Sequence, residues 1–591
     1  MKKLLISTFI FSLSAAFFFA QEAIKSIEDE YYDFLSLTGV VERPYLNYKT
    51  LSDSLWTYND VTSMLENEDG TFTKVREPGN ESDRNVWKNN NLSTRFRLWE
   101  ADQAADNWFT RGIDQGLSLR IYGPEWYNSY NTAAPYGQND GALWQGRGYN
   151  TSLTAGARLE AYGFELTFKP QLSFSQNMAF DLMDNSAYYS NKFAYTWGYG
   201  GDKGADAPQR FGDSAFWTFD WGDTEARWSW HSFTVGFGTQ AIWLGPAWLN
   251  PTLHSNNAAT YPKFDFGLRK TEIKIPHFGW SLGYIEARMW IGQTTESDYF
   301  DKDDSNNHNQ ITGMTFSYAP SFLPGLTLGV NKICMSKWDN DEYYKYLNPF
   351  YDVNNDEDQK LSLTADWLFP KVGLEIYGEL GVDDYIQGWH SHSPVQSVIR
   401  NPFHTMTYSI GLKKTVTLSK KKDVYGEIIF EWNCTEMSQD FQFEWPYNFG
   451  FHHITTQGYT NKGQWIGSGT GYGGNSQILA FNTYYHKGNT LFFIWRNNPD
   501  NNYIYSKTIS TTSADKETYY KNYVAYKANF NLGFNTNYYF TNYLSLQGGF
   551  AWNLIMNPHY NPYQKNKDTD MYGIPTNENN FHINLGIKYI F

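Results

Sequence analysis

The chain ends on Phe581-His-Ile-Asn-Leu-Gly-Ile-Lys-Tyr-Ile-Phe591, and this stretch decides the fold. Its odd positions are large and apolar, whereas the even positions include His582, Asn584, Gly586 and Lys588. Residues two apart on a β-strand share a face, so this strand has one apolar face and one polar face. A soluble edge strand could alternate in the same way. The pattern is typical of a strand that closes a transmembrane β-barrel, with one face to lipid and the other to a polar lumen.

The start of the chain carries an export signal. Lys2 and Lys3 precede an apolar core, residues 4–19, that is too short to span a membrane, so residues 1–20 are predicted to be a signal peptide. The C-terminal strand is similar to the recognition signal of bacterial outer-membrane barrels, which implies contact with the barrel assembly machinery. The two ends together predict a location in the outer membrane of a Gram-negative-type envelope, with outer-membrane lipid around the barrel.

Composition supports a barrel and excludes several other classes. Phe, Trp and Tyr make up 19% of the 591 residues, yet the mean hydropathy is −0.58, which excludes a disordered chain and a helical membrane protein. The net charge of −15 disfavours nucleic acid as a partner, because phosphate binding needs a basic surface. Cys334 and Cys434 cannot form a disulfide framework, and their spacing indicates no metal site, so we expect two structural thiols.

Alternation recurs along most of the chain. Residues 311–330 and 361–382 each contain two alternating runs, which turn near Pro324-Gly325 and at Pro370-Lys371. Short turns of this kind are typical of the periplasmic end of a barrel. At roughly 25 to 30 residues for each strand and loop, the remaining chain predicts an antiparallel all-β transmembrane barrel of about 16 to 18 strands.

Residues 21–91, which precede the barrel of residues 92–591, differ in pattern. Ser26 can cap a helix whose apolar residues fall at helical spacing, and Gly39 suits its end. Apolar spacing over residues 52–65 predicts a second helix. We therefore expect a small helical element on the periplasmic side.

The inward positions of the strands carry charges of both signs. Sequence parity places the following side chains inside the barrel: Arg95, Arg97, Arg158, Glu160, Glu286, Arg288, Glu375, Glu379, Glu427 and Glu431. Paired carboxylates could indicate a glycosidase, which needs two at a fixed separation. Residues two apart on a strand always share a face, however, so ion-pair networks across the lumen are the simpler interpretation. No Ser, His and Asp arrangement indicates a nucleophile, and we expect no catalytic residue, cofactor or metal.

Residues 243–263 leave the alternating pattern and mix Gly and Pro with aromatic and amide residues. Aromatic faces beside amide and imidazole groups suit sugars, whose C–H faces stack while their hydroxyls take directed hydrogen bonds. The alternative is an ordered loop whose tryptophans only pack in the barrel mouth. The candidate polysaccharide-binding residues here are Trp243, Trp248, His254, Asn256, Asn257 and Tyr261.

Residues 447–477 have the same character. Their candidate binding residues are His452, His453, Tyr459 and Trp465. The glycine-rich run at 467–474 lacks the Lys-Ser/Thr ending of a phosphate loop. Adjacent histidines on a strand face opposite ways, so a shared metal ion is not expected.

These segments resemble blocks of the Wzi family of capsule assembly proteins. Trp243-Leu244-Gly245-Pro246, followed by Ser255-Asn256-Asn257-Ala258, is similar to the family's Trp-x-Gly-Pro block. The other similar blocks are Leu37-Thr38-Gly39-Val40-Val41 with Pro44, the strand pair around Tyr377-Gly378-Glu379 and Asp383-Asp384, and His452-His453 with Gln457-Gly458-Tyr459 and the glycine run. The likeness extends over most of the mature chain, and the order of the blocks makes it specific.

The resemblance implies an 18-stranded barrel with a periplasmic helical element and a lumen obstructed by inward-folded loops. It also implies a lectin-like, non-catalytic role in holding or assembling capsular or other surface polysaccharide. The alternative from another class is an outer-membrane diffusion porin for small polar or sugar solutes.

Overall fold

The computed structural model describes most of the predicted barrel and part of the segment before it. The described residues are 27–53, 57–58, 64–66, 72–74, 95–103, 105–183, 191–194, 205–301, 303–338, 343–351, 356–383, 406–422, 424–436, 449–502, 527–541, 543–560, 564–565, 572–573 and 576–589. The predicted signal peptide lies outside them.

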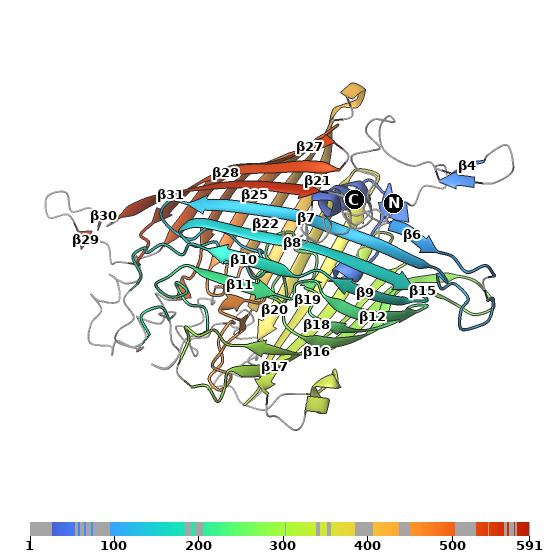
Figure 1. The fold of residues 1–591 in the computed structure, drawn as a ribbon, viewed down its shortest axis with the longest axis horizontal. Coiled ribbons are helices and arrows are strands. Elements are labelled where there is room, and N and C mark those ends of the chain that lie inside the picture. Colours follow the sequence, from blue (N-terminus) through green and yellow to red (C-terminus); the bar gives the residue numbers. More distant parts are fainter. Residues whose placement is uncertain are drawn as a thin grey trace, which may run out of the picture.

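The main sheet is a closed antiparallel barrel (Figure 1). Among the described residues it contains 21 strands that occupy 18 positions around the barrel, because three positions hold two strands each. β9 and β10 share one position, since both pair with β8. β11 and β12 share the next position, where β11 pairs with β10 and β12 pairs with β9. The short β6 and β31 share the third, since both pair with β7. The ring closes where β31 pairs with β7. The strands are β6 (Arg95–Trp99), β7 (Leu117–Asn131), β8 (Gly148–Ala161), β9 (Phe164–Phe168), β10 (Gln171–Ser175), β11 (Phe216–Asp220), β12 (Glu225–Trp230), β13 (Phe233–Gly238), β15 (Lys263–Lys274), β16 (Ser281–Thr295), β17 (His308–Pro320), β18 (Leu326–Lys337), β19 (Asp358–Phe369), β20 (Leu374–Asp383), β21 (Met406–Ser419), β22 (Val424–Cys434), β25 (Asn475–Tyr485), β26 (Gly488–Asn498), β27 (Ala528–Thr541), β28 (Leu544–Met556) and β31 (Asn577–Tyr589).

Short connections lie at one end of the barrel and long ones at the other. The two predicted hairpins are confirmed, since β17 and β18 are joined by residues 321–325 and β19 and β20 by residues 370–373. The chain enters and leaves the barrel at the short-turn end, on the right in Figure 1. Short elements outside the barrel wall are β1 (Val41–Glu42), β2 (Tyr48–Lys49), η1 (Leu51–Asp53), β3 (Thr57–Tyr58), β4 (Met64–Glu66), β5 (Phe72–Lys74), β14 (Trp243–Leu244), η5 (Tyr343–Leu347), η6 (Lys420–Lys422), β23 (Thr460–Asn461), β24 (Gln464–Trp465), β29 (Gln564–Lys565) and β30 (Tyr572–Gly573).

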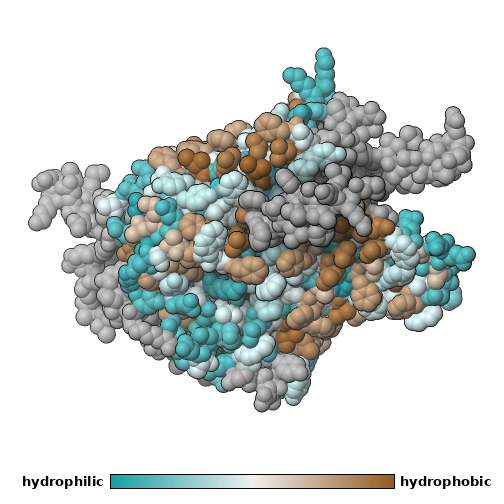
Figure 2. Space-filling view, in the orientation of Figure 1, coloured by the Kyte–Doolittle hydropathy of each residue, from teal (hydrophilic) through white to brown (hydrophobic). Residues whose placement is uncertain are grey.

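The outer face of the barrel is apolar, as the alternation predicts. On β31 the side chains of Ile583 and Leu585 are 52% and 53% exposed, whereas His582 and Asn584 are buried on the inner face. Figure 2 shows apolar side chains gathered along the upper edge, over β27 and β28. A surface of this kind is stable only against lipid, so the lipid and lumen faces assigned from the sequence are correct.

The N-terminal segment contains a helix, but a shorter helical part than the sequence predicts. α2 (Ile27–Ser36) forms as expected, and the turn that follows it closes at Gly39, whose positive φ of 74° suits a residue without a Cβ. The proposed cap, Ser26, lies outside the described residues. The second helix over residues 52–65 is wrong where the chain is described, because Leu51–Asp53 is a single 3-10 turn and Thr57–Tyr58 and Met64–Glu66 are strands. Over the described residues, no helix is both long and apolar enough to cross a membrane.

The closing strand gives a first testable prediction. Deleting Phe591, which lies outside the described residues, should impair assembly of the barrel, because in the sequence it continues the alternation of large apolar residues that faces lipid along β31. The measurement is the fraction of heat-modifiable, folded protein in the outer-membrane fraction. Truncated protein that reaches the membrane and folds as efficiently as the full chain would refute a role for this residue in assembly.

Candidate functional site

The N-terminal segment runs into the lumen and is fixed to the barrel wall. The carboxylate of Glu286 on β16 accepts hydrogen bonds from the backbone N–H groups of Leu46, Asn47 and Tyr48, at 2.9, 2.9 and 2.8 Å. The Asn47 amide also donates to Asn331 on β18, at 2.7 Å. An inward glutamate therefore holds backbone groups that would otherwise be unpaired in the interior.

The segment between β13 and β15 crosses the lumen from the long-loop end. Its strand β14 pairs with β2 of the N-terminal segment. Glu431 on β22 accepts from the backbone N–H groups of Trp248, Leu249 and Asn250, and the nearest of these contacts are 2.6, 3.0 and 2.8 Å. Two segments that are far apart in the sequence thus meet inside the barrel.

The segment at 449–474 packs on the segment between β13 and β15. The hydroxyls of Tyr459 and Tyr472 donate to the carbonyl oxygens of Leu253 and Thr252, both at 2.8 Å. Where the three segments and the wall meet, a core of buried side chains includes Tyr48, Ile242, Leu244, Leu253, Tyr261, Trp290, Ile311, Ile333, Tyr459, Ile466 and Tyr472. We call residues 27–53, 239–262 and 449–474 together the plug. It obstructs the part of the lumen where it packs against β16, β17 and β18.

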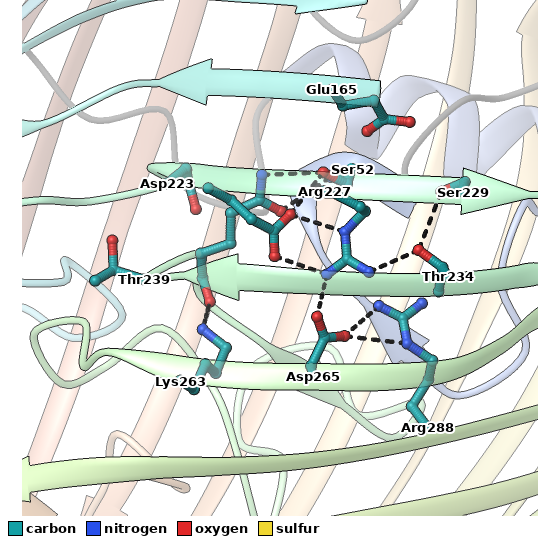
Figure 3. A network of polar contacts seen from close by, with 12 residues as sticks. Ser52, Glu165, Asp223, Arg227, Ser229, Thr234, Thr239, Lys263, Asp265 and Arg288 are labelled. Carbon is teal, nitrogen blue, oxygen red and sulfur yellow. Dashed lines mark hydrogen bonds and ion pairs between the residues drawn. The ribbon is translucent and has the colours of Figure 1, made fainter. Parts of the chain in front are cut away.

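The predicted ion-pair networks are present along part of the wall. Arg227 contacts both Glu225 and Asp265, and Asp265 also pairs with Arg288 at 2.5 Å (Figure 3). Arg158 contacts both Glu160 and Glu165. Glu375 pairs with Arg43 of the plug and with Lys413 of the wall. The side chains of Arg95 and Arg97 lie outside the described residues.

Three of the inward glutamates have a different role from the predicted one. Glu286, Glu431 and Glu379 accept from backbone N–H groups of the plug; for Glu379 the donor is Thr252, at 2.8 Å. Glu427 is buried beside Tyr484, whose hydroxyl lies 3.5 Å from its carboxylate. For the three glutamates, the ion-pair interpretation is incomplete, because backbone amides of distant loops are also their partners.

Several candidate residues of 243–263 are buried inside the plug. His254 donates through Nδ1 to the Ile242 carbonyl at 2.9 Å, so its Nε2 accepts from the Tyr261 hydroxyl at 2.8 Å. Burial lowers the pKa of His254 to about 3, which keeps the ring neutral. Trp243 donates to the Ala247 carbonyl at 3.0 Å, and Asn256 is buried too. These contacts hold the plug together.

The candidate residues of the second segment, 447–477, differ in how far they are buried. Tyr459 is fully buried, and His452 accepts from the backbone N–H groups of Ile454 and Thr455 at 3.3 and 3.1 Å. Burial also lowers the pKa of His452. His453 is exposed, with its ring centroid 4.6 Å from that of His452. Neither histidine lines the cavities described next.

A cleft with two adjoining cavities of about 390 and 270 Å³ opens at the long-loop end. The smaller cavity continues along the inner wall beside the plug to Leu491 and Gln547, near the short-turn ends of β26 and β28. Three candidates from the sequence line the cleft: Asn257 and Trp465 in the larger cavity and Trp248 in the smaller. The other Phe, Tyr and Trp residues of the larger cavity are Tyr136, Trp144, Phe180, Tyr472, Trp495 and Tyr560, and its amides are Gln138, Gln145, Gln209, Gln464, Asn257, Asn497, Asn529, Asn531 and Asn553. Volumes of this size are usual for small-molecule sites.

Hydrogen bonds between loops fix the walls of the cleft. Asn257 accepts from the backbone N–H of Asn139 and donates to the carbonyl of Trp465, both at 3.0 Å. Gln145 donates to Asp140 at 2.7 Å and accepts from Ser129 at 2.6 Å. The cleft is therefore built before any ligand enters, which reduces the entropy lost on binding.

Aromatic residues on two other elements, which were not predicted from the sequence, also line the cleft. Tyr136 and Trp144 lie in residues 133–144, which mix Gly, Pro and aromatic residues as residues 243–263 do, so the same signal was present there. Trp495 is an inward-facing tryptophan on β26, between the outward Ile494 and the exposed Arg496. A large aromatic residue on the polar face of a strand is the signal that could have found it.

Comparison with known proteins supports the fold. No protein-family model matches the sequence, and no curated protein sequence matches it. Among solved structures, the chain is similar to Escherichia coli Wzi, described as an outer-membrane protein involved in group 1 capsule assembly and as a carbohydrate-binding β-barrel. The TM-score is 0.55 at 11% identity, over 97% of this chain and 98% of Wzi.

Two other solved barrels are more distant. Acinetobacter baumannii OccAB4 gives a TM-score of 0.37 at 10% identity, over 81% of this chain and 98% of that one. Pseudomonas putida OprB gives 0.31 at 11% identity, over 79% and 94%. The resemblance to Wzi noted in the sequence is thus confirmed at the level of the fold, and the closed barrel with its apolar belt confirms the predicted outer-membrane location.

Proposed function

We propose that the protein is a non-catalytic outer-membrane barrel that binds or assembles surface polysaccharide of the capsular or exopolysaccharide kind. The observation that carries the proposal is the cleft that opens at the long-loop end, where aromatic faces stand beside side-chain amides. Aromatic rings stack on the C–H faces of sugars, and amides offer both donors and acceptors to hydroxyl groups. The carbohydrate-binding barrel Wzi, which has the same fold, adds support by analogy.

The position of the cleft suits a polymer rather than a passing solute. The larger cavity lies at the long-loop end, and residues 27–53, 239–262 and 449–474 obstruct much of the lumen between it and the short-turn end. A diffusion porin of this width depends on an aqueous channel. We therefore place the porin second, and planar-bilayer conductance of the full chain separates the two: a large, steady open channel would favour the porin.

Replacing Trp248 and Trp465 together by alanine should weaken polysaccharide binding while the barrel assembles normally. Each tryptophan lines one cavity of the cleft. A stacked aromatic ring contributes on the order of 1 kcal/mol beyond its buried area, so the double variant should bind roughly ten- to thirtyfold more weakly. The measurements are the polysaccharide retained on cells and the heat-modifiability of the barrel.

Trp338→Ala is the matched control, because Trp338 is an exposed tryptophan just beyond β18 that does not line either cavity. It should retain polysaccharide as the wild type does. A correctly folded Trp248→Ala/Trp465→Ala variant with wild-type retention would show that the cleft is not the binding site.

A further inference from the structure

The charged side chains around the cleft are mostly acidic. Asp140, Asp181, Asp500 and Glu578 line the larger cavity. The described lining of the larger cavity contains one lysine, Lys527, and no arginine. The described lining of the smaller cavity contains no lysine or arginine. The site thus has amides and aromatic rings in abundance but little positive charge.

Asp140 holds the central position among these acids. It lines both cavities, and Gln145, which also lines both, donates to its carboxylate at 2.7 Å. The same glutamine is held by Ser129 on β7. The loop that carries Asp140 is tied to the plug, since Gly141 donates through its backbone N–H to the carbonyl of Asn256 at 2.9 Å. The carboxylate therefore has a fixed place beside any ligand that spans the two cavities.

This arrangement is unsuited to acidic sugars. Proteins bind carboxylates with arginine forks or lysine ammonium groups, which form charge-assisted hydrogen bonds. A uronic acid in this cleft would instead lie beside fixed carboxylates, and like charges brought together across an interface are strongly disfavoured. Hydroxyl and acetamido groups, by contrast, match the donors and acceptors of the surrounding asparagines and glutamines.

We propose that the cleft takes uncharged sugar residues and discriminates against uronic acids. This inference rests on the proposed function and names the substrate class of the same site. It predicts that the polysaccharide which the protein holds is neutral along the stretch that enters the cleft.

The test uses the full chain in detergent micelles on an array of bacterial polysaccharides, both neutral and uronate-containing. The neutral polysaccharide bound most tightly is then compared with a sample of the same polymer whose primary hydroxyls have been oxidised to carboxylates, which changes charge but not linkage. At pH 8 and low salt, the oxidised polymer should bind at least about tenfold more weakly. Raising the salt concentration should reduce the difference, because ions screen exposed charges.

Asp140→Asn should recover part of the lost affinity for the oxidised polymer, because asparagine keeps an acceptor for Gln145 but carries no charge. Asp106→Asn is the matched control; Asp106 is exposed, pairs with Arg111 and lies outside the cleft. Burial raises the pKa of Asp140 to about 7, although the hydrogen bond from Gln145 acts to lower it. The carboxylate is therefore mostly charged at pH 8 and mostly neutral at pH 6. Discrimination by the wild type should therefore be smaller at pH 6 than at pH 8, which tests the role of Asp140 without a variant.

The outcomes separate this inference from the proposed function. Equal or tighter binding of the oxidised polymer, or an array on which uronate-containing polysaccharides are bound best, overturns the inference and leaves polysaccharide binding standing. Failure to bind any polysaccharide on the array overturns the proposed function itself. Weaker binding of the oxidised polymer, with partial recovery in Asp140→Asn and none in Asp106→Asn, supports the inference.

Discussion

Replacing Glu286 and Glu431 together by alanine should raise the conductance of the barrel. Each carboxylate accepts from three consecutive backbone N–H groups of the plug, in residues 46–48 and 248–250. Hydrogen bonds to charged groups contribute about 1.5 to 3 kcal/mol each, and an amide left unpaired in the interior adds a cost of similar size. Each of the two lumen-crossing segments would lose three hydrogen bonds to the wall.

Once the segments detach, the width of the barrel decides the result. A barrel of 18 strands leaves an aqueous channel unless something fills it. We expect the single-channel conductance of Glu286→Ala/Glu431→Ala in planar bilayers to exceed that of the wild type by about tenfold or more. The double glutamine variant should lie between the two, since each amide oxygen still accepts a hydrogen bond without the charge.

Glu272→Ala is the matched control for this experiment. Glu272 is a partly exposed glutamate on β15 that pairs with Lys274, not with the plug, so its loss should leave the conductance unchanged. If the double alanine variant folds and remains as closed as the wild type, packing in the core of the plug holds the segments without the two carboxylates.

These glutamates show how far the sequence could predict the lumen. Period-2 alternation placed Glu286 and Glu431 inside, because the two faces of each strand meet different solvents and the signal is local. Their partners lie about 240 and 180 residues away in the chain. No local pattern connects such positions, so the ion-pair interpretation was the simplest one available and missed the amides.

The prediction of a second N-terminal helix was wrong for a related reason. Apolar spacing over residues 52–65 suits a helix, but Ser52 is bound in the lumen by Glu225 and Gln240, at 3.1 and 3.2 Å. Contacts with the barrel wall override the weak helical preference of a short segment. By contrast, α2 and the turn at Gly39 depend on neighbouring residues and were predicted correctly.

The sequence indicated two segments that contribute to the cleft, but it could not tell which of their side chains line it. A segment rich in Trp, His, Asn and Tyr can bind a sugar. The same side chains can equally form the hydrogen bonds that hold a loop inside a polar lumen. His254 and Tyr261 serve the second purpose through their mutual hydrogen bond, whereas Trp465 and Asn257 face the cleft. Only the spatial arrangement separates these roles, because both draw on the same residue types.

Replacing Arg43 by alanine should release the N-terminal segment from the barrel. Its guanidinium, 12% exposed, lies 2.7 Å from Asp366, 2.8 Å from Asp33 and 2.9 Å from Glu375. Removing one partner of a buried ion pair typically costs 3 to 5 kcal/mol, because the remaining charge is left uncompensated. Lys413 alone would then face Asp33 and Glu375, at 2.6 and 3.2 Å. Cleavage of residues 27–53 by chymotrypsin should rise by roughly 10² to 10³-fold in the folded barrel.

The dependence of this release on pH distinguishes electrostatics from loss of packing. In the wild type, burial works to raise the pKa of Asp33, but Arg43 and Lys413 outweigh it and hold the pKa well below its usual value of 3.8. The ionised form of Asp33 therefore stabilises the docked segment above about pH 4, and the contribution is lost as the pH falls further. In Arg43→Ala the carboxylates are under-compensated, so protonation relieves them and docking should improve as the pH falls from 7 towards 5. Arg111→Ala, which removes an exposed ion pair with Asp106, should change neither the cleavage rate nor its pH dependence. Rapid cleavage of Arg43→Ala at every pH would indicate that the packing of the arginine, not its charge, holds the segment in the lumen.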